Sequence, residues 1–257
     1  EAETETPVET AADGSGTVAR VLPRRNAFGR PAVANVDALV MLASGAVPVT
    51  DPFLIDRMAV LCERNHADMA VVVNKCDLVP GDGLCAIYAS AGYPAFPVSA
   101  VSGEGIGPLR DWLRGKTVCF TGNSGAGKST LLNTLAPGFA LPTAEISEKL
   151  GRGRHTTRHV ELFALDADTY VADTPGFASL EDEASDPVRK DELADLFPEF
   201  RGPGSRCRFD DCTHRREPGC EVRAAVEDGA IHPSRYRSYL RLYEEAEKIK
   251  DWELPGK

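Results

Sequence analysis

Long apolar runs are missing from this 257-residue sequence, and their absence excludes one broad class of protein. No stretch approaches the roughly 20 apolar residues that a membrane-spanning helix needs. The N-terminal residues 1–9 are rich in glutamate and lack the basic and then apolar pattern of a secretory signal. We therefore expect no membrane anchor and a cytoplasmic location.

An excess of positive charge is also missing. Lysine and arginine total 29 against 39 aspartates and glutamates, so the formal net charge is −10. Such a surface as a whole does not favour nonspecific nucleic-acid binding, but it leaves room for a local basic face. Residues 201–241 hold nine arginines against six acidic residues. We expect this segment to face phosphate groups, with Arg235, Arg237 and Arg241 extending its positive surface.

The seven cysteines are an odd number and fall into two groups. Four of them are scattered among apolar or helical stretches, where buried free thiols are the default. The other three cluster around a histidine, and the four candidate ligands are Cys207, Cys212, His214 and Cys220. Without a secretion signal, such a cluster favours a metal over disulfides, with inert thiols as the alternative. Three thiolates and one imidazole form a closed tetrahedral set, which predicts a structural Zn²⁺.

Residues 116–130, KTVCFTGNSGAGKST, carry the strongest motif. An apolar run from Val118 to Phe120 predicts a buried strand, and a helix is expected to begin near Lys128. The spacing between them fits a phosphate loop, in which glycines let backbone N–H groups converge on phosphate oxygens. Lys128 would reach the β- and γ-phosphates, and the Ser129 hydroxyl would bind Mg²⁺. The predicted loop residues are Gly122, Asn123, Ser124, Gly125, Ala126, Gly127, Lys128, Ser129 and Thr130. The alternative is an ordinary glycine-rich turn between strand and helix.

Buried strands alternate with helical segments before this loop, which predicts an α/β fold with a mostly parallel sheet. The apolar strand 69–73 ends in Asn74-Lys75-Cys76-Asp77. The Asp77 carboxylate would accept hydrogen bonds from the N1–H and amino groups of guanine, a pair that adenine lacks. Asn74 would hold neighbouring loops and the purine, and the stem of Lys75 would lie over the base. The alternative is an ordinary turn at the end of a strand. The position at the carboxyl end of a parallel strand disfavours that alternative, because such sheets bind ligands there.

A short strand at 95–98 ends in Ser99-Ala100. This loop would give a backbone N–H to the guanine O6, although an ordinary loop is the alternative. After the phosphate loop comes the polar segment 142–159, in which Thr156 or Thr157 would complete the Mg²⁺ shell.

A predicted strand pair at 160–165 and 169–172 then leads into Asp173-Thr174-Pro175-Gly176. Asp173 would hold Mg²⁺ through water, and the Gly176 N–H would sense the γ-phosphate, which is how an order–disorder switch is built. In Ras-like enzymes a glutamine follows this glycine and orients the attacking water, but here the residue is Phe177. Either another group positions the water, or a partner supplies that group, or turnover is slow unaided. His155 is the candidate for positioning the water, and Lys128 is the second catalytic candidate because its charge would act on the phosphates. The alternative is a solvent-exposed loop histidine.

The order of these motifs differs from that of most small GTPases, because the guanine motif precedes the phosphate loop. The order therefore predicts a circular permutation, which is tolerated when the original termini lie close together. The sequences VLPRRN, ANVD, NKCD, GNSGAGKST, GRHTTRH, DTPGF and CRFDDCTHRREPGC add further detail. With them, the chain resembles the ribosome small subunit-dependent GTPase A family of circularly permuted bacterial GTPases.

The resemblance implies a partial OB-fold at 1–34, a circularly permuted P-loop GTPase domain at 35–190 and a zinc-binding α domain with a C-terminal helix at 191–257. It implies GTP hydrolysis in late 30S maturation, stimulated by the small ribosomal subunit, with 16S rRNA contacted by both flanking domains. GTP or GDP, Mg²⁺ and one Zn²⁺ would be bound, and a monomer is expected. Arginines around Phe28 would suit RNA, although a solvated loop is the favoured alternative there.

Two other functions are compatible with the same residues. One is an rRNA-binding assembly factor whose nucleotide site only senses GTP and GDP. The other is a metal-handling GTPase that delivers Zn²⁺, although a closed four-ligand site disfavours release.

Overall fold

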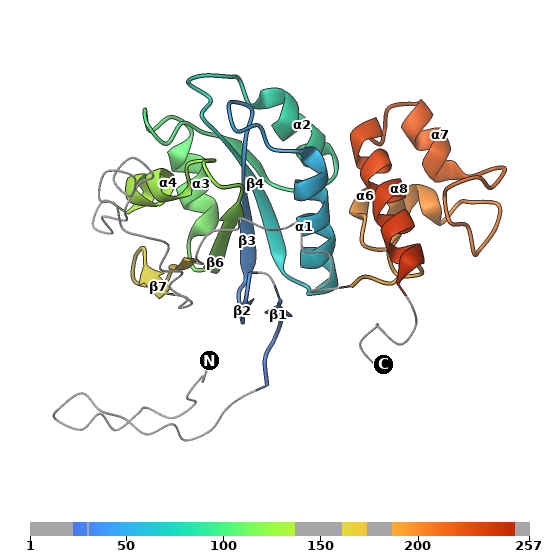
Figure 1. Cartoon of the computed structure of the whole chain (residues 1–257), viewed down its shortest axis with the longest axis horizontal. Coiled ribbons are helices and arrows are strands. Elements are labelled where there is room, and N and C mark those ends of the chain that lie inside the picture. The colour runs from blue at the N-terminus through green and yellow to red at the C-terminus, as the bar shows by residue number, and fades with distance from the viewer. Residues whose placement is uncertain (1–22, 30, 137–160, 174–186, 250–257) are drawn as a thin grey trace.

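The computed structural model describes residues 23–29, 31–136, 161–173 and 187–249, and Figure 1 shows their arrangement. A six-stranded sheet in the order β5-β4-β3-β6-β8-β7 forms the centre of the larger part of the chain. All neighbours are parallel except β7 and β8, which are antiparallel. The bounds are β3 Ala38–Ser44, β4 Asp68–Asn74, β5 Ala95–Pro97, β6 Thr117–Gly122, β7 Glu161–Ala164 and β8 Tyr170–Asp173.

Helices cover both faces of this sheet. One face packs against α1 (Pro52–Arg64) and α2 (Asp82–Ser90), and the other packs against α3 (Ile106–Leu113) and α4 (Lys128–Leu135). All seven residues of the central strand β3 are buried, as expected for a parallel strand covered on both sides. The mostly parallel α/β fold predicted from the sequence is therefore confirmed.

The strand order places a topological switch point beside β3. The strand β4 follows β3 on one side, and β6 lies on its other side. In open α/β sheets, ligands bind in the crevice that forms outside the carboxyl ends of the strands at such a point. The register puts Ser44 opposite Asn74 and Leu42 opposite Gly122, so the predicted guanine motif and phosphate loop leave the sheet at the same edge.

A second, all-helical part follows, drawn in orange and red in Figure 1. It contains α6 (Pro198–Gly204), α7 (Glu221–Glu227) and α8 (Pro233–Lys248), and α8 lies against α1 of the sheet domain. Its aromatic core includes Phe197, Phe200 and Tyr239 and is joined by Val60 of α1.

Three short helices were not predicted, namely α2, α6 and α7. The sequence of α6 is PEFRGPG, whose internal glycines and proline disfavour a helix on local propensity. Buried Phe200 holds this segment against α8, so packing decides its conformation.

The segment around Phe28 differs from both sequence interpretations. It forms a hairpin in which β1 (Ala27–Phe28) pairs with β2 (Val33–Ala34), and Phe28 is buried in the core that contains β3 and α1. Neither a solvated loop nor a base-stacking aromatic is therefore correct for Phe28. The domain boundary at residue 34 stays a prediction.

Candidate functional site

Two glycines of the predicted phosphate loop sit where no other residue fits. Gly122 has a φ of +150°, and a Cβ there would lie 2.3 Å from the Leu42 carbonyl oxygen. Gly127, the N-cap residue of α4, has a φ of +97°, and its Cβ would lie 2.4 Å from Asn74 Nδ2. The loop can therefore pass close to both neighbouring strands and deliver the chain into α4, whose N-terminus favours an anion. Lys128, Ser129 and Thr130 form the first turn of that helix.

Asn74 joins the three loops that meet at this edge of the sheet. Its Nδ2 donates to the Ala126 carbonyl oxygen at 2.9 Å, and its Oδ1 accepts from the Ala100 N–H at 3.0 Å. The side chain is only 2% exposed, so both bonds lie in a site sheltered from water. The phosphate loop, the end of β4 and the Ser99-Ala100 loop are therefore held in one arrangement, although 52 residues separate Asn74 from Ala126.

Ser99 positions Asp77 through its side chain. The Ser99 hydroxyl donates to Asp77 Oδ1 at 2.6 Å and accepts from the Ser102 N–H at 3.1 Å. Asp77 itself is exposed, so its carboxylate remains accessible to a ligand. From the sequence, the Ser99-Ala100 loop was expected only to donate a backbone N–H to the guanine O6. The motif gave no indication of the hydroxyl contact, because Ser99 and Asp77 lie on different loops.

The backbone N–H groups of Ser99 and Ala100 both donate within the protein. Ser99 N bonds the Glu104 carbonyl oxygen, and Ala100 N bonds Asn74 Oδ1. Donation from Ser99 or Ala100 to a guanine O6 would therefore require one of these bonds to be exchanged.

Lys75 has a left-handed backbone conformation, with a φ of +65°. Its ammonium group donates to the Val47 carbonyl oxygen at 2.8 Å, a contact that the sequence did not predict. Val47 belongs to the loop between β3 and α1, which thereby becomes part of the same edge.

Several predicted switch and catalytic residues lie outside the described residues, namely His155, Thr156, Thr157 and Gly176. Asp173 is the last residue of β8 and pairs in register with Phe120 of β6. Its backbone therefore ends next to the strand that enters the phosphate loop.

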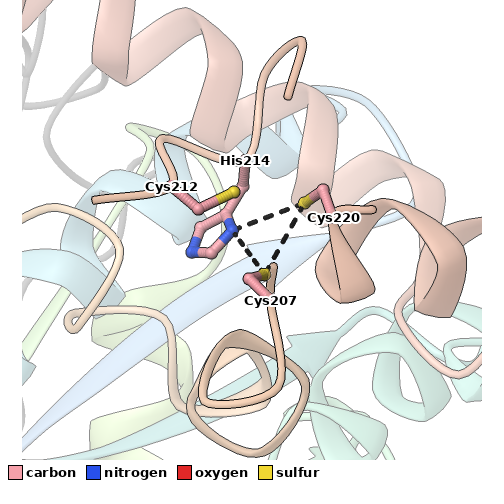
Figure 2. A group of neighbouring side chains, drawn as sticks. All are labelled: Cys207, Cys212, His214 and Cys220. Carbon is pink, nitrogen blue, oxygen red and sulfur yellow. Dashed lines mark hydrogen bonds between the residues drawn. The ribbon is translucent and has the colours of Figure 1, made fainter. Parts of the chain in front are cut away.

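The Cys/His cluster lies in the helical part, where Figure 2 shows the four side chains converging. All four potential ligand atoms lie within 4.8 Å of one another. The His214 Nδ1 atom is 3.6 Å from Cys207 Sγ and 3.5 Å from Cys220 Sγ, and the two sulfur atoms are 4.0 Å apart. In a tetrahedral zinc site, the usual zinc–ligand bond lengths place a nitrogen and a sulfur ligand about 3.6 Å apart and two sulfur ligands about 3.8 Å apart. The donor set therefore fits Zn²⁺.

The surroundings of the cluster favour metal ligation by the histidine. Burial lowers the pKa of His214, so its imidazole is neutral at pH 7, the form that binds metals. Burial also raises the pKa of Cys212 to about 12, so in the absence of a cation this sulfur stays a thiol. A bound cation is what would make the thiolate stable there.

The loop that carries the ligands is fixed by hydrogen bonds from outside the cluster. The Glu217 carboxylate accepts from the Thr213 N–H and hydroxyl and from the N–H groups of Arg215 and Arg216. Burial acts to raise the pKa of Glu217, but these hydrogen bonds outweigh it and set the pKa to about 2.

Two tyrosines of α8 bind the same loop. Tyr236 donates its hydroxyl to the His214 carbonyl oxygen, and Tyr239 donates to that of Thr213. The helix therefore supports the ligands through the backbone that carries them.

Arg235 does not lie on the positive surface, so that prediction is wrong. It is 1% exposed and donates to Asp56 Oδ1 at 2.6 Å and to Glu199 Oε1 at 2.6 Å. Arg241 is exposed, but its guanidinium lies 3.6 Å from the centroid of the Phe53 ring. Helical spacing alone could not reveal these contacts, because the face of α8 that meets α1 is set by packing between two domains.

None of the helices in the described ranges is long and apolar enough to cross a membrane.

The fold and these two sites define a class of protein. It is a phosphate-loop GTPase with circularly permuted motifs, followed by a helical part with a Cys₃His cluster whose geometry fits a metal ion. A family model described as RsgA GTPase matches residues 21–183. The chain belongs to the RsgA GTPase family. It is a GTP-hydrolysing enzyme that binds GTP, its product GDP, and Mg²⁺.

Similar proteins support this assignment over most of the chain. A relative from Thermotoga maritima is 42% identical over 245 residues, covering 93% of this chain and 80% of the relative. One from Caldanaerobacter subterraneus subsp. tengcongensis is 41% identical over 244 residues, covering 94% and 81%. Both are named small ribosomal subunit biogenesis GTPase RsgA.

Two solved structures are similar to this fold. YjeQ from Thermotoga maritima has a TM-score of 0.76 at 37% identity, covering 93% of this chain and 81% of that one. YloQ, described as a circularly permuted GTPase, has a TM-score of 0.75 at 31% identity, covering 98% and 83%. The circular permutation expected from the motif order is therefore confirmed.

Proposed function

We propose that this chain hydrolyses GTP during late maturation of the small ribosomal subunit, that the subunit stimulates hydrolysis, and that the domains flanking the GTPase domain contact 16S rRNA. Relatives above 40% identity carry the name small ribosomal subunit biogenesis GTPase. The observation that carries the nucleotide assignment is the position of Asn74, which is bonded to both the phosphate loop and the Ser99-Ala100 loop. We also infer a cytoplasmic monomer.

The guanine base would be recognised by Asp77. A carboxylate accepts two hydrogen bonds at once, which matches the N1–H and amino group of guanine and not the edge of adenine. Ser99 supports this selectivity because its hydroxyl donates to Oδ1 and so fixes the carboxylate plane. The stem of Lys75 would cover the base from one side.

The phosphates would bind where α4 begins. Backbone N–H groups from Gly122 to Thr130 and the Lys128 ammonium would neutralise their charge, and Ser129 would bind Mg²⁺. Mg²⁺ supplies charge neutralisation on the β- and γ-phosphates when bound. Thr156 or Thr157, Asp173 and Gly176 would complete this end of the site as the switch that responds to the γ-phosphate.

We assign the orientation of the attacking water to His155, because Phe177 stands where Ras-like enzymes have glutamine. With small subunits present, the His155→Ala variant is expected to hydrolyse GTP about a hundredfold more slowly. This loss is at the lower end of what a positioned general base contributes. Single-turnover phosphate release measures this. An unchanged rate, with and without small subunits, would remove His155 from the mechanism.

The Cys₃His cluster would hold one structural Zn²⁺, and the surface around it would contact rRNA. Arg206, Arg208 and Arg216 are exposed within two residues of a candidate ligand, and Arg237 is exposed on α8. Phe209 is 41% exposed, and the Arg208 guanidinium lies 5.6 Å from its ring centroid. Exposed arginine and aromatic side chains together suit single-stranded RNA, because the arginines bind its phosphates and the aromatic rings stack on its bases.

The function is tested by phosphate release from GTP and from ATP, each with and without 30S particles. We expect GTP to be hydrolysed, ATP to be ignored and 30S particles to raise the rate. The matched variant Asp77→Asn should lose GTP activity and gain activity with XTP, because xanthine presents a carbonyl where guanine has its amino group. Equal use of GTP and ATP by the natural chain would contradict the site assignment.

The same assay separates the two alternative functions. A factor that only senses nucleotide would bind GTP without multiple turnovers in the presence of 30S particles. A zinc-delivery GTPase would lose its metal during turnover, whereas a structural site keeps one zinc per chain.

A further inference from the structure

The loop between β3 and α1, residues 45–50, lies at the same edge of the sheet as the predicted guanine motif and phosphate loop. It follows the central strand of the sheet at the carboxyl edge. Two elements of the predicted site touch it. Val47 accepts the hydrogen bond from the Lys75 ammonium, and the Pro48 ring lies 3.3 Å from where a Cβ on Gly125 would be.

This loop is closed at its base by buried hydroxyl groups. The Thr50 Oγ1 atom accepts from the Ser44 N–H at 3.0 Å, and the Thr50 N–H donates back to the Ser44 carbonyl oxygen at 2.9 Å. The Ser44 hydroxyl donates to the Ala46 carbonyl oxygen and accepts from the Ala46 N–H. Ser44 is fully buried and Thr50 is 2% exposed, so water does not compete for these bonds.

The base of the loop is also aligned with the guanine motif. Ser44 pairs in register with Asn74, the residue directly before Lys75. The loop and the lysine therefore start from neighbouring positions on adjacent strands. A displacement of the loop base would move the Val47 carbonyl relative to the Lys75 ammonium.

We propose that Ser44 and Thr50 are positioning residues for nucleotide binding. They hold the Val47 carbonyl where it anchors the Lys75 ammonium, and this anchor keeps the lysine stem over the purine. The proposal rests on the proposed function, since it requires a guanine nucleotide beside Asp77. It adds a fourth loop to the cradle, one that lies against both the phosphate loop and the guanine motif.

The test compares Thr50→Val with the natural chain in titrations with fluorescently labelled GDP. Valine keeps the shape of threonine and removes the hydroxyl acceptor. We expect GDP to bind about tenfold more weakly, which corresponds to the loss of one hydrogen bond that orients a charged group. At saturating GTP the turnover should stay within about twofold, because the loop acts on binding. Thr50→Ser retains the hydroxyl and should bind GDP as tightly as the natural chain does.

A matched control comes from the opposite edge of the sheet. Thr169 is 1% exposed, and its Oγ1 accepts from the Gly115 N–H at 3.1 Å, so its chemistry resembles that of Thr50. Thr169→Val should lower the unfolding midpoint at least as much as Thr50→Val and leave GDP affinity unchanged. A merely structural role for Thr50 predicts equal effects of the two variants on binding.

A double-mutant cycle with Lys75→Met decides whether Thr50 acts through the lysine. If it does, adding Thr50→Val to Lys75→Met should weaken GDP binding by less than about twofold, since coupled effects do not add. Additive losses would overturn the proposal, as would full GDP affinity in Thr50→Val. If Lys75→Met itself binds GDP normally, the assignment of the guanine site to Lys75 also fails. The two failures are therefore distinguishable.

Discussion

Arg235→Met is expected to destabilise the folded chain by about 3–5 kcal/mol, because it leaves two buried carboxylates without a counter-charge. The side chains of Asp56 and Glu199 are 0% and 5% exposed. The guanidinium that neutralises them donates through Nε and both terminal nitrogens. Its central carbon also lies 4.7 Å from the ring centroid of Phe197. Methionine fills a similar volume and supplies no charge.

The cost is large because water cannot replace the missing cation. Burial already raises the pKa of Asp56, although Arg235, Ser238 and Tyr88 act in the opposite direction. Without Arg235, the carboxyl groups must either stay ionised in an apolar site or take up protons. Both outcomes lower the free energy of unfolding at neutral pH.

Urea unfolding at constant protein concentration measures this effect. Arg237→Met is the control, since Arg237 is exposed on the same helix, and it should change stability by less than about 0.5 kcal/mol. Equal stabilities of the two variants would show that the buried cluster contributes nothing. Asp56 lies on α1, Glu199 on α6 and Arg235 on α8, so the cluster joins the helical part of the chain to the sheet domain.

Cys220→Ser is expected to abolish stoichiometric zinc binding and to unfold the helical domain at a temperature where the natural chain is intact. Structural zinc contributes about 10–16 kcal/mol in small zinc-binding peptides. Here the aromatic core of Phe197, Phe200 and Tyr239 supports the fold as well, so we expect a loss of several kcal/mol. Cys220 Sγ is one corner of the ligand set, and serine is a poor replacement for a thiolate.

Metal analysis by mass spectrometry and thermal unfolding measure the two parts of this prediction. Cys85→Ser makes the same chemical change at a cysteine that is 8% exposed, close to the 6% of Cys220. That variant should retain one zinc per chain. Retention of zinc by Cys220→Ser would contradict the four-ligand assignment.

Contiguous motifs were sufficient for the class of protein. Residues 122–129 and 74–77 each carry their chemistry within one loop, so their type and spacing predict a nucleotide site. Their reversed order predicted the permutation. The four predicted metal ligands lie within one short segment, and the structure brings all four together.

Contacts between distant segments could be decided only by the tertiary structure. The Asn74 bonds, the Val47 anchor of Lys75 and the burial of Arg235 each depend on which loops and helices meet. Phe28 shows the same limit, because arginines beside an aromatic residue look exposed in sequence while the hairpin buries the ring.

The amino-acid sequence by itself therefore determined the residue types and spacing of each motif, since the side chains of one motif are neighbours along the chain. The tertiary structure decided how the sites are supported. Strand order sets which loops share the carboxyl edge of the sheet, and the packing of α8 on α1 sets which arginine loses its water. Both are properties of long-range packing, which local sequence patterns do not encode.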